Sequence, residues 1–389
     1  MQAVVIGKLL NTRFRIVHGC FPPLYFLLAM AILWGALGCE SEKPPIRIGF
    51  AGGLTGRYSD LGVGGRNGVQ LAVEEINRSG GIHGRRVELI VKDDRNDPDT
   101  AVQVDRELIR EKVAAIIGHM TSAVTMAAIP LINSERMLLI SPTTSTSALT
   151  GIDDWFFRTA GTNDILAVAL ADYLMERTAV RRMNVIFDSS NGAYTETFIK
   201  TFRSRFVELG GRLTLVASFS GGNDSLRDVV SQSLLLPSCD GVLILAGGLD
   251  AAWICQQIRK QDADIPIFAT GWPMTQEFLE HAGRSADGVR FIDYFNWNSQ
   301  TPLYVQFQKS YVKRYATPPT FSAVYAYEAA QVLFEALRNN PDPSALKQTI
   351  IGIRRFSGLF EDFEIDAFGD AHRKAYLLSA ENGRFLTEE

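Results

Sequence analysis

The stretch IRIGFA (46–51) is followed by NGVQLAVEEINRS (67–79), a glycine pair at 80–81, and VELIV (87–91). The outer segments are short runs rich in β-branched residues, whereas the middle one repeats its apolar residues at helical spacing. Glycines directly after the last apolar residue are typical of a helix end. Strand, helix and strand in this order predict a βαβ unit, which pairs its strands in parallel.

The alternation of strands and helices continues along the chain. We expect further strands at 113–118, 138–141, 184–187, 213–219, 241–246, 265–269 and 289–293, and helices at 99–111, 164–177, 193–209, 225–235, 251–261, 302–315 and 321–338. Parallel strands joined by helices indicate an α/β fold. The length of the chain and a restart of the pattern after residue 163 predict two Rossmann-like lobes with parallel-rich sheets.

The N-terminus has the composition of an export signal. Basic residues precede an apolar run at 24–37, which is too short to span a bilayer as a helix. The run ends in Ala36-Leu37-Gly38-Cys39, similar to a bacterial lipobox, in which the cysteine carries the lipid. We therefore predict a signal peptide at 1–39, lipidation at Cys39 and a polar tether at 40–45. A soluble secreted protein and an uncleaved anchor are the alternatives.

The composition and motifs argue against several function classes. A net charge of −4 argues against a nucleic-acid partner. The sequence has no His-Glu-x-x-His zinc pair, no Gly-x-Ser-x-Gly elbow and no Walker A motif, so we expect no catalytic residue, no metal and no cofactor. Glycines at 62–68 invite a dinucleotide interpretation, but Asn67 stands where the third glycine belongs. His119 follows a strand without a nucleophile partner, and Cys239 and Cys255 are expected as unbridged thiols.

Hydroxyl groups gather where two neighbouring strands end. Ser122 precedes a helix, and Thr143, Thr144 and Ser145 follow a strand. Open α/β sheets bind ligands at the carboxyl ends of their strands, and helix N-termini favour anions. These residues therefore predict a site for a small carboxylate, with simple helix capping as the alternative for each of them.

Several motifs resemble one family over residues 46–389. They are GGLTG (52–56), EINRSGGIHG (75–84), DD (93–94), ISPTTS (140–145) and YAYEA (325–329). The chain resembles the leucine/isoleucine/valine-binding family of type I periplasmic ligand-binding proteins. The resemblance implies that Ser122, Thr143 and Ser145 hold a ligand carboxylate and that Tyr194 closes over the ligand from the second lobe.

The sequence departs from the family pattern at three places. The acid that pairs with the ligand ammonium group is replaced by Gly271-Trp272-Pro273, so Asp250 or Asp293 would have to supply that charge. Alternatively, Trp272 offers a cation–π or stacking face, or packs at the hinge. Leu61 stands where an aromatic residue is expected, with Tyr58 as a substitute. Thr121 occupies the place of a cysteine of the family's first-lobe disulfide.

Together these features predict an extracytoplasmic, lipid-anchored protein that captures an amino acid or related carboxylate for an ABC importer and its permease. Lobe one would comprise 46–162 and 292–356, and lobe two 163–291 and 357–389, joined by three hinge crossings that allow closure. A sensor of the same fold that feeds a receptor or regulator is the alternative, followed by a Rossmann-type enzyme.

Overall fold

The computed structural model describes residues 43–220, 226–231 and 239–388. The predicted signal peptide, Cys39 and the first part of the tether lie outside the described residues. Pro44–Glu389 forms one compact unit, which is described here by itself.

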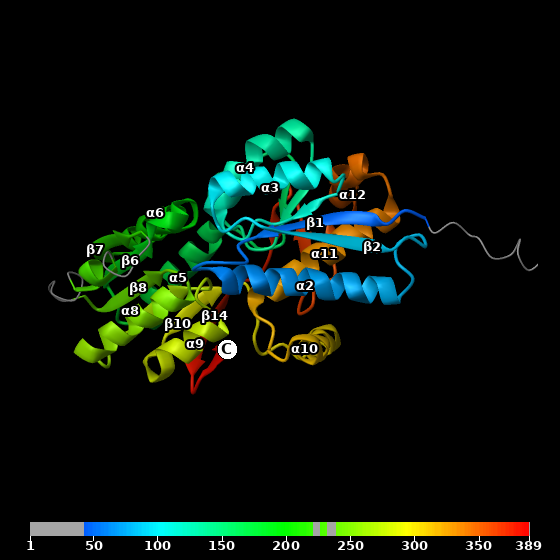
Figure 1. Ribbon diagram of the computed structural model, residues 1–389. Coiled ribbons are helices and arrows are strands. Elements are labelled where there is room, and N and C mark those ends of the chain that lie inside the picture. The colour runs from blue at the N-terminus through cyan, green and yellow to red at the C-terminus, as the bar shows by residue number, and fades with distance from the viewer. Residues whose placement is uncertain (1–42, 221–225, 232–238, 389) are drawn as a thin grey trace, which may run out of the picture. The chain divides into compact units, whose positions relative to one another are not determined.

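The first sheet has five strands, all of them parallel, in the order β2-β1-β3-β4-β5. The strands are β1 (Ile46–Gly52), β2 (Val87–Asp93), β3 (Ile116–Ile117), β4 (Leu139–Ser141) and β5 (Phe156–Arg158). Helices α3 (Pro98–Arg110) and α4 (Ser122–Glu135) cover one face, and α2 (Ser59–Arg78) and α11 (Phe321–Asn339) cover the other (Figure 1). The central strands are buried on both faces, as is usual for parallel sheets.

The second sheet repeats this order and adds two strands. Its parallel part is β7-β6-β8-β9-β10, and β14 and β15 extend it in antiparallel fashion. The strands are β6 (Arg182–Asp188), β7 (Arg212–Phe219), β8 (Gly241–Leu245), β9 (Ile267–Thr270), β10 (Arg290–Asp293), β14 (Tyr376–Glu381) and β15 (Arg384–Thr387). Helices that pack with this sheet in the described ranges include α5 (Asn163–Arg177), α6 (Gly192–Glu208), α8 (Gly248–Gln261) and α9 (Gln276–Ala282). The α/β fold with two parallel-rich sheets is therefore confirmed.

Helix α2 starts earlier than the sequence predicts, and its glycines have a packing role. A Cβ atom at Gly62 would lie 2.0 Å from the carbonyl oxygen of Gly53, and one at Gly68 would lie 2.1 Å from that of Ala323 in α11. These glycines lie inside the helix and permit close backbone contact. They do not form the tight turn between strand and helix that a dinucleotide site needs.

The chain crosses between the two sheets three times, after β5, after β10 and before β14. The boundaries differ from those predicted. Ile292 and Asp293 pair within the second sheet, so the second crossing follows residue 293. The segment 357–372, assigned to the second lobe, belongs with the first, because the Leu359 amide donates to Glu328 of α11 and the Arg158 amide of β5 donates to the Gly369 carbonyl.

The segment 355–372 forms its own antiparallel sheet of β11 (Arg355–Phe356), β12 (Phe363–Ile365) and β13 (Ala371–His372). Two more helices, α10 (Pro302–Tyr315) and α12 (Leu346–Ile353), complete this side of the molecule.

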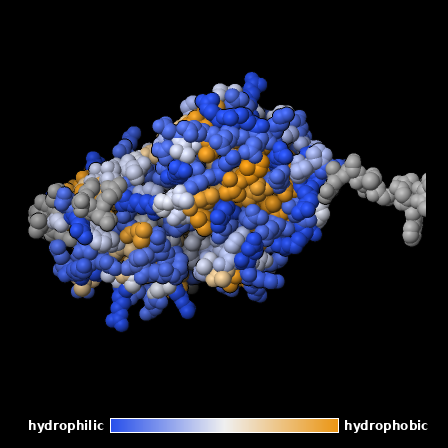
Figure 2. Space-filling view, viewed as in Figure 1, coloured by the Kyte–Doolittle hydropathy of each residue, from blue (hydrophilic) through white to orange (hydrophobic). Residues whose placement is uncertain are grey.

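On the surface, β2 is the edge strand of the first sheet. Leu89, Ile90 and Val91 are half-buried there, and Figure 2 shows an apolar patch over β1 and β2 on this face. Within the described ranges no helix is both long and apolar enough to cross a membrane. Cys239 and Cys255 are both free thiols, as expected.

Candidate functional site

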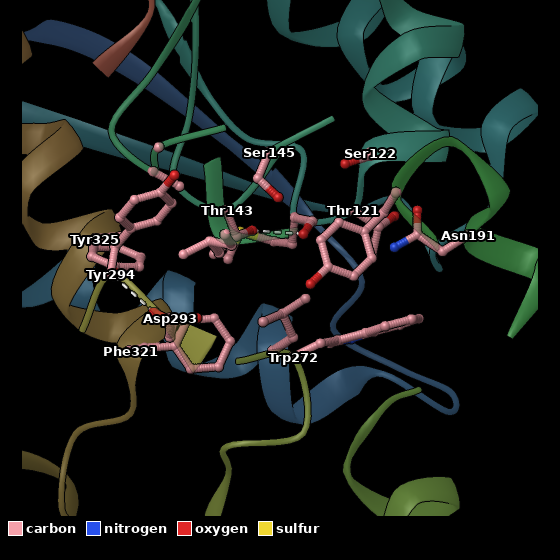
Figure 3. Close-up of a pocket in the computed structure, with 16 residues that line it drawn as sticks. Thr121, Ser122, Thr143, Ser145, Asn191, Trp272, Asp293, Tyr294, Phe321 and Tyr325 are labelled. Atoms are coloured by element: carbon pink, nitrogen blue, oxygen red, sulfur yellow. Dashed lines mark hydrogen bonds between the residues drawn. The ribbon is translucent and has the colours of Figure 1, made fainter. Parts of the chain in front are cut away.

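A cavity of about 50 Å³ lies at the carboxyl ends of strands from both sheets (Figure 3). Seven of the ten predicted ligand residues line it, namely Leu61, Ser122, Thr143, Ser145, Tyr194, Trp272 and Asp293. A single water needs about 10–15 Å³ of such space, so the cavity has room for several water-sized groups and suits a small solute.

Ser122 is the first residue of α4 and follows directly on the loop after β3. Its neighbour Thr121 occupies the N-cap position, but the Thr121 hydroxyl donates to Asn96 Oδ1 at 2.6 Å and does not cap the helix. The next amide, that of Ala123, donates to Asn191 Oδ1 at 3.0 Å. The N-terminus of α4, which favours negative charge, therefore faces the cavity wall formed by Ser122 and Asn191.

The three predicted hydroxyls after β4 take different roles. Thr143 lines the cavity, but its hydroxyl donates to the Met120 carbonyl at 2.6 Å. Thr144 is fully buried and bonds Thr125 of α4 at 2.6 Å, so it points away from the cavity, contrary to the prediction. The Thr144 amide donates to the Ser141 hydroxyl at 3.0 Å, and the bend at 142–143 turns the Thr144 side chain toward α4. Ser145 lines the cavity.

No group in the described part of the chain hydrogen-bonds the hydroxyls of Ser122 and Ser145. Both side chains are nevertheless almost completely buried. A hydroxyl proton is a donor that a carboxylate can use, whereas the Thr143 proton is already engaged. Ser122 and Ser145 are thus the available hydroxyl donors among the predicted residues.

Three aromatic side chains form a separate cluster of Tyr58, Tyr194 and Trp272. The Trp272 ring lies 5.3 Å from that of Tyr58 and 5.8 Å from that of Tyr194, the latter edge-to-face. Tyr58 does not line the cavity, contrary to the prediction. Its hydroxyl bonds Asp188 at the end of β6, and burial, followed by the charge of Asp188, raises its pKa. Tyr58 therefore packs against Trp272 without lining the cavity itself.

The two candidate acids lie in different places. Asp250 does not line the cavity, because it forms an ion pair with Arg57 in a separate surface groove. Asp293, at the end of β10, does line it. The Tyr325 hydroxyl donates to Asp293 Oδ1 at 3.1 Å and the Phe295 amide donates to the same oxygen at 2.9 Å. Burial raises the pKa of Asp293 to about 6.

His119 is completely buried and does not line the cavity. Its Nδ1 lies 2.6 Å from Asp94 Oδ2 and its Nε2 lies 3.1 Å from Asp105 Oδ2. Burial lowers the pKa of His119, but the two carboxylates outweigh it and raise the pKa to about 10. Its carbonyl also accepts a bond from the Ser141 hydroxyl at 2.7 Å, so this ion cluster joins the ends of β2, β3 and β4.

Sequence reasoning missed several cavity residues, among them Asn191, Phe321 and Tyr325. Asn191 lies in the loop after β6. A polar residue directly after a predicted strand could have indicated it as a site residue. Phe321 and Tyr325 lie on α11, far along the chain, and only tertiary packing brings them to the cavity. The described ranges contain no group of three or more side chains placed to hold a metal ion.

Comparison with known proteins finds one family model, described as periplasmic binding protein, over residues 45–384. The Leu/Ile/Val-binding protein homolog 1 of Brucella suis is 24% identical and covers 90% of this chain and 93% of its own length. The leucine-, isoleucine-, valine-, threonine- and alanine-binding protein of Pseudomonas aeruginosa is 26% identical and covers 67% of this chain and 69% of its own.

Among solved structures, the branched-chain amino acid transporter substrate-binding protein LivJ of Streptococcus pneumoniae, in complex with isoleucine, superposes with a TM-score of 0.81. It is 23% identical and covers 88% of this chain and 99% of its own. A solute-binding protein of an ABC transporter from R. palustris, in complex with benzoate, has a TM-score of 0.78 at 19% identity, over 88% and 95% of the two chains.

Proposed function

Because the chain belongs to the periplasmic binding protein family, we propose that it captures a small carboxylate-bearing solute outside the cytoplasm and delivers it to the permease of an ABC importer. The observation that carries this proposal is the cavity at the carboxyl ends of both sheets, with the Ser122 and Ser145 hydroxyls directed to it (Figure 3). Capture changes no covalent bond of the solute.

The wall at α4 suits a carboxylate for three reasons. Ser122 and Ser145 each supply a hydroxyl proton, and the positive end of the α4 dipole lies beside them. All of these groups are shielded from water. A hydrogen bond to a charged group in such surroundings contributes about 1.5–3 kcal/mol, so two of them account for a large share of a micromolar affinity.

Contacts between the two sides of the cavity support a mechanism of hinge closure. Tyr58, before α2, bonds Asp188 and Ser190 after β6, and Asn191 bonds the N-terminus of α4. In the proposed mechanism a solute binds the α4 side first. The β6 side then closes over it through these contacts, the chain bending at the three crossings.

The N-terminal predictions complete this proposal. A signal peptide at 1–39, cleaved before Cys39, would export the chain. A lipid on Cys39, the new N-terminus, would keep it beside the permease through the tether at 40–45. Mass spectrometry of the mature N-terminus tests both points, and an unmodified or absent Cys39 would contradict the anchor.

A thermal-shift screen of the protein against amino acids, amides and small aromatic carboxylates tests the proposal directly. A solute at about 100 times its Kd should stabilise the fold by roughly 2.7 kcal/mol. If no carboxylate in the panel shifts the melting temperature, capture of this solute class is wrong.

Replacing both serines locates the binding groups. The Ser122→Ala plus Ser145→Ala variant should weaken binding of the screened carboxylate about a hundredfold or more, since two hydrogen bonds to a charged group at about 1.5–3 kcal/mol each are lost. Ser134→Ala is the matched control, because Ser134 lies near the other end of α4 and bonds the Leu131 carbonyl. Unchanged affinity of the double variant by calorimetry would remove both serines from the site.

A further inference from the structure

We propose that Asp293, oriented by Tyr325, binds an ammonium group of the solute, so that the captured molecule carries both charges. This inference rests on the proposed function and names the solute class, an amino acid rather than a simple carboxylic acid. It assigns the positive group of the ligand to the end of β10, not to the segment after β9 where the family resemblance places an acid.

The position of Asp293 is the first argument. In Figure 3, Asp293 and Tyr325 lie on one side of the cavity, and Thr143, Ser145 and Ser122 lie on the other. A molecule that fills the space between them meets hydroxyl donors at one end and a carboxylate at the other. A zwitterion presents the complementary charge to each wall.

The hydrogen bonds of Asp293 are the second argument. The Tyr325 hydroxyl and the Phe295 amide both donate to Oδ1, and neither reaches Oδ2. Oδ2 packs over Gly271, where a Cβ atom would lie 1.5 Å from it. The carboxylate is therefore held in a fixed orientation by one oxygen. The absence of a side chain at Gly271 makes room for the second oxygen, Oδ2.

The missing counter-ion is the third argument. Among the described residues Asp293 forms no ion pair. The charge of Arg373, which is itself paired with Glu328, favours the ionised form of Asp293 only from a distance. An ionised carboxylate buried without a cation is costly. A ligand ammonium group would remove this cost on binding, and the aromatic face of Trp272 on the same cavity offers it a second favourable contact.

One rival interpretation makes the opposite prediction about pH. A protonated Asp293 could donate a hydrogen bond to the carboxylate of a ligand that has no ammonium group. In that case binding would strengthen as the pH falls from 7.5 toward about 6 and would level off below 6. An ammonium site requires the ionised form, so its binding would weaken about tenfold for each pH unit below 6.

The pH range from 5 to 7.5 distinguishes these two cases only if the neighbours of Asp293 do not titrate within it. They are Tyr194 on α6, Tyr294 beside it in the chain, Tyr325 on α11 and Arg373 before β14. Burial raises the pKa of all three tyrosines above the usual value, and Arg373 pairs with Glu328. None of the tyrosines titrates between pH 5 and 7.5.

The test is calorimetry of the protein with L-leucine and L-phenylalanine and with their deaminated counterparts, 4-methylpentanoate and 3-phenylpropanoate, at pH 5 and pH 7.5. β-Alanine and γ-aminobutyrate extend the panel to wider charge spacing. We expect an amino-bearing member to bind at least a hundredfold more tightly than the acids that lack the amino group, and to bind about tenfold more weakly at pH 5.

Asp293→Asn should weaken the binding of the amino-bearing ligand at least thirtyfold and should change the affinity for the deaminated acids less than threefold. Tyr325→Phe should have a smaller effect in the same direction. Asp264→Asn, an exposed acid before β9, is the control. Equal losses for both ligand types, or tighter binding of the deaminated acids, would overturn the ammonium site and leave carboxylate capture intact. If neither type binds, both proposals fall.

Discussion

Buried carboxylates at the ends of two strands have opposite surroundings. At the end of β3, His119 lies between Asp94 and Asp105, so the positive charge is paired with negative charges of the protein itself. At the end of β10, Asp293 is held by neutral donors alone and lines the cavity. Burial is common to both, and the difference lies in the partner. A buried charged group whose partners all belong to the protein has a structural role. A buried carboxylate that lacks a counter-ion and lines a cavity indicates a binding site for a ligand.

The pKa shifts express the same difference. His119 has a folded pKa of about 10, above its ordinary 6.5, so its contribution to stability is fully present below 6.5 and is lost as the pH rises toward 10. Asp293 has a pKa of about 6, above its ordinary 3.8, so the ligand-free fold loses stability as the pH rises from about 4 to 6.

The largest expected effect comes from removing His119. His119→Ala leaves two carboxylates buried without their cation, which should lower the free energy of unfolding by about 3–5 kcal/mol. Urea unfolding at pH 7.5 measures this, with His281→Ala on the surface as the control. A loss below about 1 kcal/mol would contradict a structural ion cluster.

The pH dependence gives the next effect. Unfolding by urea between pH 6.5 and 10 should show the wild type losing on the order of a few kcal/mol, because the imidazolium loses its proton more readily in the unfolded chain. The His119→Ala variant should lack most of this slope. A parallel decline in both proteins would assign it to other groups.

Asp293→Asn should act in the opposite direction on stability. The amide keeps an oxygen for the Tyr325 and Phe295 donors but has no charge, so the ligand-free protein should gain about 1–3 kcal/mol at pH 7.5. Thermal or urea unfolding at pH 7.5 and pH 4 measures this, and the gain should shrink at pH 4. A destabilised variant would show that the ionised carboxylate already has a protein partner.

The smallest effect is expected at Asp250, which the sequence offered as an alternative ammonium partner. Its carboxylate pairs with Arg57 outside the cavity. Asp250→Asn should therefore change the affinity for any solute less than threefold in calorimetry. A loss as large as that of Asp293→Asn would mean that the two acids act together.

The sequence predicted the fold well, because periodicity and strand–helix alternation report directly on local structure. Strands at 87–91 and 241–246 and the hydroxyl-bearing loops after β3 and β4 were found in this way. The βαβ rule then placed Ser122 and Ser145 at one edge of the sheet without any tertiary information.

The errors have physical causes that periodicity does not contain. Thr144 and Ser145 are neighbours, and only the local backbone decides which of them faces the cavity. Asp250 follows a glycine pair at a strand end, as a site residue would, but Arg57 captures its charge. The segment 357–372 has short β runs whose partners are set by distant contacts, such as that of Leu359 with Glu328.

A crystal structure of the protein with the tightest-binding amino acid of the panel tests the central claim most directly. The account predicts the ligand in the cavity between the two sheets, with its carboxylate oxygens about 2.6–3.2 Å from the Ser122 and Ser145 hydroxyls and its ammonium nitrogen at a similar distance from Asp293. A ligand bound outside this cavity would contradict the account.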